Sequence, residues 1–228
     1  MTTDTPAAVL WDMDGTLVDT EPYWMRAETE LVESFDGVWT HEDALGVVGL
    51  GLWESARIFQ AAGVDLTADE IVDRLTDRVQ EQLDTDGVPW RPGARALLAE
   101  LREAGVPTAL VTMSVQRMAE QVAALIGFPA FDVIVTGETV ANPKPFPDAY
   151  LSAAAQLGVS AADCVAIEDS VPGLASAVAA GAVAIGVPHM VPLDGATTHA
   201  TWPTLDGRTL DDLVGVYRGA VAAKGIAR

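Results

Sequence analysis

The chain has little cysteine, little lysine and no long apolar run. Among its 228 residues there is one cysteine, Cys164, and there are two lysines, Lys144 and Lys224. A single cysteine excludes an internal disulfide and is typical of cytoplasmic proteins, so we expect a cytoplasmic location. No apolar run approaches the roughly 18 residues of a membrane span. Met1–Asp4 lacks the basic start of a secretory signal, so no such signal is predicted.

Positive charge is scarce throughout. The chain has 13 lysines and arginines against 33 aspartates and glutamates, a formal net charge of −20. Such a protein repels nucleic acid and anionic membranes, so we expect neither as a partner. It also repels a phosphorylated small molecule, unless a local cation or ordered N–H groups reverse the sign at one site. The position of Lys144 is therefore of interest.

Hydrophobic residues, in contrast, make up half of the chain, which is enough for one good-sized domain or for a core with a smaller insert. Short apolar runs at 8–11, 106–111, 133–136, 164–167 and 182–187 predict buried strands. Helical patterns separate them from residue 91 onward. Strands that alternate with helices in this way predict an α/β fold, a doubly wound parallel sheet with helices on both faces.

Residues 20–88 contain no strand candidate. Apolar residues at Trp24, Ala27 and Leu31 follow a helical spacing, and Thr67-Ala68-Asp69-Glu70 is a capping box that begins another helix. We therefore predict an all-helical domain at 20–88, inserted into a core made of 1–19 and 89–228.

The polar residues that could take part in catalysis or binding follow the predicted strands. They are Asp12 and Asp14, Thr112 with Ser114, Lys144, and Glu168 with Asp169. In a doubly wound sheet the carboxyl ends of the strands converge on one crevice. Four acids, two hydroxyls and one lysine suit a magnesium-assisted phosphoryl transfer, since a hard cation takes carboxylate oxygens and lysine balances the charge of the phosphate.

These segments resemble the four motifs of the haloacid dehalogenase superfamily. The matching stretches are Asp12-Met13-Asp14-Gly15-Thr16-Leu17-Val18-Asp19-Thr20, then Thr112, then Pro143-Lys144-Pro145, then Ile167-Glu168-Asp169-Ser170 with Gly173. More narrowly, the chain resembles the phosphatases and β-phosphoglucomutase-like phosphomutases that carry a helical cap after the first motif. The resemblance covers nearly the whole chain and implies a Rossmann-like core.

The resemblance implies a role for each catalytic residue. Asp12 would be the nucleophile that forms an aspartyl-phosphate, and Asp14 the general acid and base. Thr112 would bind the phosphoryl oxygens together with backbone N–H groups, that of Met113 among them. Lys144 would neutralise both the nucleophile and the phosphate.

The resemblance also implies a Mg²⁺ cofactor. Asp12, the backbone carbonyl of Asp14, and Asp169 would bind the ion, with Glu168 as a direct or a water-mediated ligand. The substrate would be a small phosphorylated metabolite, and we expect the protein to be a monomer or a weak homodimer.

Within the superfamily, we predict a phosphatase that acts on a sugar phosphate. Similar mutases have a histidine where this chain has Trp24, and they have an arginine in the first cap loop, whereas Val48–Trp53 contains none. The stretch Thr20–Trp24 instead resembles sugar-phosphate phosphatases. We expect Trp24, Gly51, Leu52 and Trp53 to face the leaving group, while Arg26 or Arg57 could still supply a positive charge.

A β-phosphoglucomutase-like mutase remains the alternative. A dehalogenase would need only the nucleophile, so Asp14 and Glu168-Asp169 would have no role in its reaction. A phospho-receiver module would lack the helical insert and would carry its aspartate on a later strand. Cys164 is expected to pack in the core, and the histidines His41, His189 and His199 are expected at the surface.

Overall fold

The computed structural model describes residues 5–226, so Met1–Asp4, where no secretory signal is predicted, lie outside the described part. Its centre is a six-stranded parallel sheet in the order β3-β2-β1-β4-β5-β6. The strands are β1 (Ala8–Trp11), β2 (Thr108–Val111), β3 (Val133–Val135), β4 (Cys164–Glu168), β5 (Val183–Gly186) and β6 (Ala200–Thr201). The predicted α/β class and the five predicted strands are confirmed, and the two-residue β6 is an addition at the edge.

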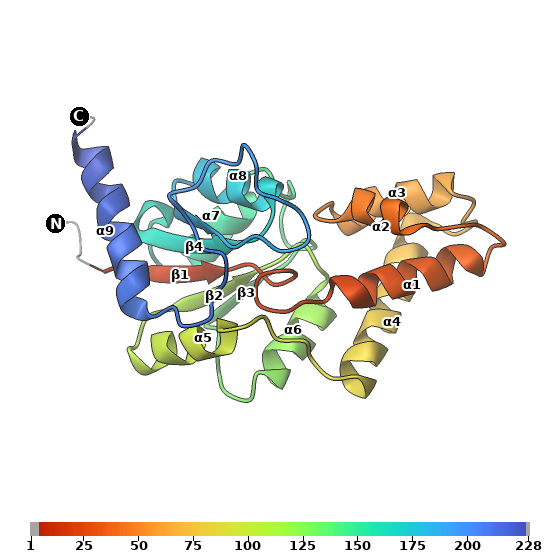
Figure 1. Cartoon of the computed structure of the whole chain (residues 1–228), viewed down its shortest axis with the longest axis horizontal. Coiled ribbons are helices and arrows are strands. Elements are labelled where there is room, and N and C mark those ends of the chain that lie inside the picture. The colour runs from red at the N-terminus through yellow and green to blue at the C-terminus, as the bar shows by residue number, and fades with distance from the viewer. Residues whose placement is uncertain (1–4, 227–228) are drawn as a thin grey trace.

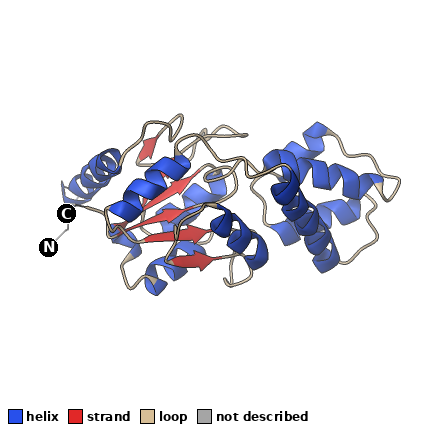
Figure 2. Cartoon of the chain, turned by 90° about the horizontal axis from the view of Figure 1, so that it is seen from below, coloured by secondary structure: helices blue, strands red, loops and turns tan. Residues whose placement is uncertain are grey.

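Helices cover both faces of the sheet (Figure 2). On one face lie α5 (Ala94–Glu103), α6 (Gln116–Leu125) and α9 (Leu210–Ile226); on the other lie α7 (Asp148–Gln156) and α8 (Val171–Ala179), with a 3-10 turn at Ala161–Asp163. Side chains alternate along β1, so Val9 and Trp11 pack on the first group of helices while Ala8 and Leu10 pack on the second. Cys164 is buried in the second core, as expected.

Four helices lie together beside the sheet, at the end away from both termini (Figure 1). They are α1 (Glu21–Glu33), α2 (His41–Val47), α3 (Leu52–Ala61) and α4 (Ala68–Thr85), and we call them the helical insert. Capping boxes begin two of them, Thr40 with Asp43 at α2 and Thr67 with Glu70 at α4, as the sequence indicates. The domain division at 20 and 88 stays a prediction.

The two connections to the helical insert run side by side. Val18 forms an antiparallel bridge with Trp90, the Asp19 amide donates to the carbonyl of Pro89 at 2.7 Å, and the Arg91 amide donates to Leu17 at 3.0 Å. His189 braces both of them: its ring pairs with Asp19 at 2.6 Å and with Arg91 at 2.7 Å. The expected surface position is wrong for His189, because these two partners cover most of its ring.

We predict that His189→Ala loosens both connections. Asp19 and Arg91 then lose a shared partner, which costs about 1–3 kcal/mol of stability. Hydrogen exchange should show faster exchange of the amides at 17–19 and 89–91, and calorimetry should show a lower Tm. The control is His41→Ala on exposed α2; equal effects of the two variants would contradict the bracing role.

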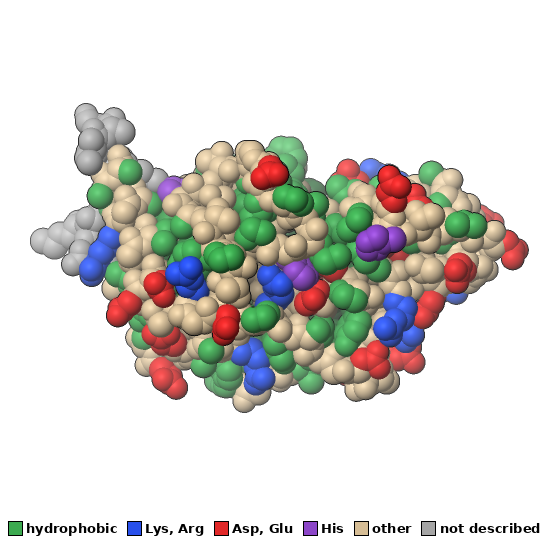
Figure 3. Space-filling view, viewed as in Figure 1, with side chains coloured by type: hydrophobic (Ala, Val, Ile, Leu, Met, Phe, Trp, Pro, Cys, Tyr) green, Lys and Arg blue, Asp and Glu red, His purple; other side chains and the backbone are tan. Residues whose placement is uncertain are grey.

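The charged side chains do not gather into a basic patch on the face drawn in Figure 3. Among the described residues, no helix is both long and apolar enough for a membrane crossing.

Candidate active site

Strand pairing brings the first and fourth motifs together. Trp11, the last residue of β1, pairs with Ile167 of β4, and the Asp12 amide donates to the carbonyl of Ile167 at 3.0 Å. Asp12 therefore leaves the sheet next to Glu168 and Asp169. Thr112 follows β2 on the other side of β1, so the predicted residues from three strands meet at one edge.

Lys144 lies at the centre of this edge. Its ammonium donates to Asp12 Oδ1 at 2.6 Å, to Glu168 Oε1 at 2.6 Å and to the carbonyl of Val111 at 3.0 Å. These contacts use all three of its donors. Its side chain is 5% exposed, so the ion pairs form in a poorly solvated place where charge–charge interactions are strong.

Three carboxylates share this buried place with the single ammonium. Asp12, Glu168 and Asp169 each offer an oxygen within 4.8 Å of the others. Asp12 Oδ2 is buried and has no hydrogen-bond partner in the described part of the chain. An orphaned carboxylate oxygen beside two further acids is what a hard divalent cation needs, so these residues fit a metal site.

Backbone geometry keeps the acids this close. Gly15 has φ +86°, and a Cβ there would lie 2.0 Å from Asp169 Oδ2, while a Cβ at Gly173 would lie 1.9 Å from Glu168 Oε1. Thr16 also donates to Asp169 Oδ1 at 3.3 Å. The glycines of the first and fourth motifs thus leave the space that the carboxylates occupy.

Glu168 is almost saturated by the protein itself. Oε1 accepts from Lys144 and, at 2.9 Å, from the hydroxyl of Tyr150, and Oε2 accepts from the amide and the hydroxyl of Ser170. Its predicted role as a direct or water-mediated metal ligand stays a prediction. Its observed contacts hold Lys144 and the start of α8 in place.

Crowding of the acids changes their proton affinity. Burial raises the pKa of Asp12 to about 7, with repulsion from Glu168 adding to the rise and Lys144 opposing it. Burial, together with repulsion from Asp12 and Glu168, holds the pKa of Asp169 well above its usual range. The single lysine therefore does not neutralise the cluster, and additional positive charge would stabilise it.

We predict that the protein without metal loses stability as pH rises. Asp12 has a higher pKa folded than unfolded, so the folded state binds more protons between pH 4 and 7 and its stability falls across that range. Calorimetry with chelator should show a Tm that falls with pH over this range. Added Mg²⁺ should raise the Tm more at pH 8 than at pH 5, and an equal or absent effect at both would contradict the reading.

Asp14 faces away from this cluster, toward polar donors. Its carboxylate accepts from Thr20 at 2.5 Å, Trp24 at 3.4 Å, Thr112 at 3.3 Å and Ser114 at 2.7 Å. All four partners are donors, an arrangement suited to an acceptor-only carboxylate. The Asp14 side chain is not part of the acidic cluster. That its backbone carbonyl binds the ion stays a prediction.

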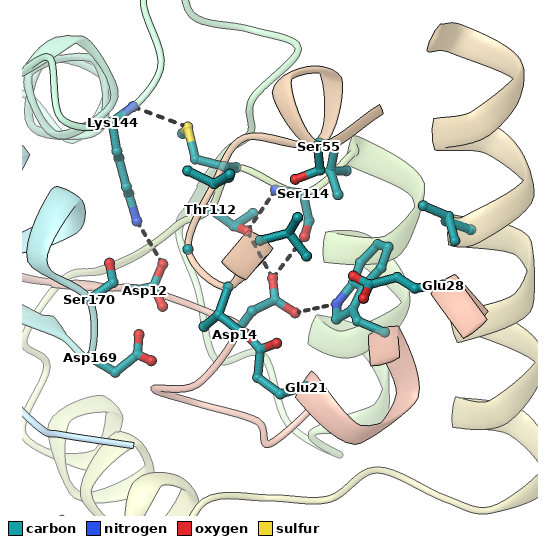
Figure 4. Close-up of a pocket in the computed structure, with 18 of the residues that line it drawn as sticks. Asp12, Asp14, Glu21, Glu28, Ser55, Thr112, Ser114, Lys144, Asp169 and Ser170 are labelled. Carbon is teal, nitrogen blue, oxygen red and sulfur yellow. Dashed lines mark hydrogen bonds and ion pairs between the residues drawn. The ribbon is translucent and has the colours of Figure 1, made fainter. Parts of the chain in front are cut away.

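A cavity opens between this edge and the helical insert (Figure 4). From the sheet side it is lined by Asp12, Asp14, Thr112, Met113, Ser114, Lys144, Asp169 and Ser170, and from the insert side by Glu21, Trp24, Glu28, Val47, Val48, Gly49, Leu50, Leu52, Ser55, Phe59 and Leu75. The predicted core residues therefore share one cavity, apart from Glu168, which does not line it and is bound to Lys144.

The predicted substrate contacts from the insert are only partly brought together. Trp24 and Leu52 line the cavity, whereas Gly51 and Trp53 do not, and the Trp53 indole donates to Asp69 at 2.8 Å. Arg26 pairs with Asp86 on the surface, and Arg57 is exposed. Neither arginine supplies a positive charge to this cavity.

Comparison with known proteins agrees with this geometry. A family model described as haloacid dehalogenase-like hydrolase matches residues 6–181. The chain belongs to this family. It is therefore a hydrolase, as the sequence motifs predict.

The similar proteins include hexitol phosphatases and CbbY proteins. Hexitol phosphatase A of Escherichia coli is 37% identical over 178 residues, 78% of this chain and 81% of that protein. The plasmid-encoded CbbY of Cupriavidus necator is 34% identical over 198 residues, 79% and 78% of the two chains. A crystal structure of a CbbY mutant from Rhodobacter sphaeroides with xylulose-1,5-bisphosphate superposes with a TM-score of 0.83 at 28% identity, covering 92% and 99%.

The sequence motifs did not reveal several contacts that the structure shows around the hydrolase site. Thr20 and Ser114 bind Asp14, Tyr150 binds Glu168, and Glu21 and Glu28 line the cavity. Thr20 lies within the first motif and Ser114 is a candidate beside Thr112, but neither position predicts the contact with Asp14. The others are ordinary helix positions whose orientation depends on how the helices pack.

Proposed function

We propose that this hydrolase removes phosphate from a small phosphate monoester of a sugar or sugar alcohol. The observation that carries the proposal is the Asp12 carboxylate with one unpartnered oxygen, held by Lys144 at 2.6 Å and open to a cavity beside Thr112. The likeness to hexitol phosphatase A supports a polyhydroxylated substrate.

In the first step, the carboxylate of Asp12 attacks phosphorus. The bond from phosphorus to the ester oxygen breaks, the leaving oxygen takes a proton from Asp14, and an aspartyl-phosphate forms. Lys144 offsets the negative charge of Asp12, and Thr112 with the backbone N–H of Met113 binds the phosphoryl oxygens.

In the second step, Asp14 accepts a proton from water, and the hydroxide attacks the aspartyl-phosphate at phosphorus. The bond to Asp12 breaks, and phosphate and a free Asp12 result. The four donors around Asp14 suit the carboxylate form that this step requires.

Mg²⁺ is the cation we propose for the acidic cluster. Asp12, Asp169 and the carbonyl of Asp14 would hold it, and Glu168 would support it directly or through water. When bound, the ion would balance the charge of the acids and of the phosphoryl oxygens, as hard cations do in phosphoryl transfer.

A β-phosphoglucomutase-like activity is less well supported. Trp24 stands where similar mutases have a histidine, and its indole donates to Asp14. Among the described residues, the helical insert brings no lysine or arginine to the cavity that could bind a second phosphate.

We further propose that residues 20–88 act as a cap on a core of 1–19 and 89–228, opening for substrate and closing to exclude water. The hinges would lie in the paired connections near Val18 and Trp90. A cytoplasmic location and a monomer or weak homodimer complete the proposal.

The test is phosphate release from sugar, sugar-alcohol, nucleotide and short-acid phosphates, with Mg²⁺ and with chelator. Asp12→Asn should lower kcat by a factor on the order of 10⁴ or more, because the amide cannot act as the nucleophile. The control is Asp65→Asn, the same change at an exposed position of the insert. Metal-independent turnover, or an active Asp12→Asn, would overturn the mechanism.

A further inference from the structure

The wall of the cavity formed by the helical insert contains two polar groups that the proposed chemistry does not use. They are the carboxylate of Glu28 on α1 and the hydroxyl of Ser55 on α3, both shown in Figure 4. Glu28 is 7% exposed and Ser55 is 6% exposed, so neither is an ordinary surface residue.

Both groups make few hydrogen bonds within the protein although they are nearly buried. Among the described residues, the only partner of the Glu28 side chain is the Trp39 indole, which donates to Oε2 at 3.2 Å. In the same part of the chain, Glu28 Oε1 and Ser55 Oγ make no hydrogen bond, and both residues line the cavity. Polar groups with so little exposure are normally hydrogen-bonded, so Glu28 and Ser55 can each bind a polar group of a molecule in the cavity.

The position of Glu28 suits recognition of a leaving group. Glu28 follows Glu21 by seven residues on α1, which places it about 10 Å further along the helix axis. Glu21 lies close enough to Asp14 for that carboxylate to raise its pKa, after burial itself, to about 8. Of these two glutamates of α1, Glu28 is therefore the one further from Asp14 and from the reacting phosphate.

The charge of the cavity restricts what can bind there. Lys144 is the one cation among the described residues of the lining, and it is already bound to Asp12 and Glu168. Glu21 and Glu28 line the opposite wall. A second phosphate would meet these two acidic side chains with no compensating cation, whereas a substrate hydroxyl can donate to an oxygen of either one.

We propose that Glu28 and Ser55 bind hydroxyl groups of an uncharged, polyhydroxylated leaving group, and that Glu28 also rejects substrates with a second phosphate. The proposal rests on the proposed phosphatase function and specifies its substrate class. Around these two groups Val47, Leu52 and Phe59 provide apolar surface for the C–H faces of the same molecule.

The experiment compares kcat/KM for three substrates: glucitol 6-phosphate, hexyl phosphate and fructose 1,6-bisphosphate. Hexyl phosphate has the same chain length as the first but no hydroxyls. Glu28→Leu should lower the preference for glucitol 6-phosphate over hexyl phosphate about 10- to 100-fold, the effect of losing a hydrogen bond to a charged group. Ser55→Ala should lower it less, since its hydroxyl is neutral.

Glu28→Gln separates charge from hydrogen bonding. It keeps an acceptor for Trp39 and for a substrate hydroxyl, so it should retain much of the polyol preference while the bisphosphate gains relative to the monophosphates. The matched control is Glu33→Gln, the same loss of charge at an exposed position of the same helix, which should leave all three ratios unchanged.

The outcomes distinguish this inference from the proposed function. If the wild-type protein hydrolyses none of the three, the phosphatase proposal fails for these substrates. If it is active but the Glu28 variants change all three rates equally, Glu28 only supports the fold through Trp39 and the inference is overturned. Calorimetry of each variant confirms that it is folded under the assay conditions.

Discussion

The ion pairs of Lys144 are the interaction on which the site depends. One ammonium joins Asp12, Glu168 and the end of β2, and so connects three strand ends through a single group. Removal of one partner of a buried pair leaves an uncompensated charge, which costs several kcal/mol. The same ammonium cannot balance all three acids, because the pKa of Asp12 stays near 7 in its presence. The remaining negative charge is the reason the site favours a cation.

The rest of the molecule serves to hold this cluster at the mouth of a cavity. Parallel strands deliver the acids to one edge, and glycines at 15 and 173 let Asp169 and Glu168 approach the backbone. The helical insert closes the other side with Trp24, Glu21 and Glu28. Its two connections are paired with each other and braced by His189, so the insert is attached at one narrow place. In the proposed mechanism, the groups that react with phosphate and the groups that select the leaving group therefore lie on opposite walls of the cavity.

The sequence predicted the sheet well, and it predicted which polar residues would lie together at one edge of it. Short apolar runs indicated five of the six strands, and a two-residue edge strand such as β6 is too short to form such a run. The residues Asp12, Asp14, Thr112, Lys144 and Asp169 follow strand ends, and topology alone brings such positions together. The insert was harder: its helices were predicted, yet which side chains face the cavity depends on helix packing. Trp53 and Glu28 show this, since one turns to Asp69 and the other turns inward.

The most direct test of the account is calorimetric titration of Mg²⁺ into chelator-stripped protein at pH 6.5, in two buffers with different ionisation enthalpies. The account predicts binding with release of protons, because the cation displaces protons from Asp12 and Asp169, whose pKa values are raised. The apparent binding heat should then differ between the buffers, and Asp169→Asn should weaken binding. Binding without proton release, or binding unchanged in Asp169→Asn, would contradict the claim that the acidic cluster is the metal site.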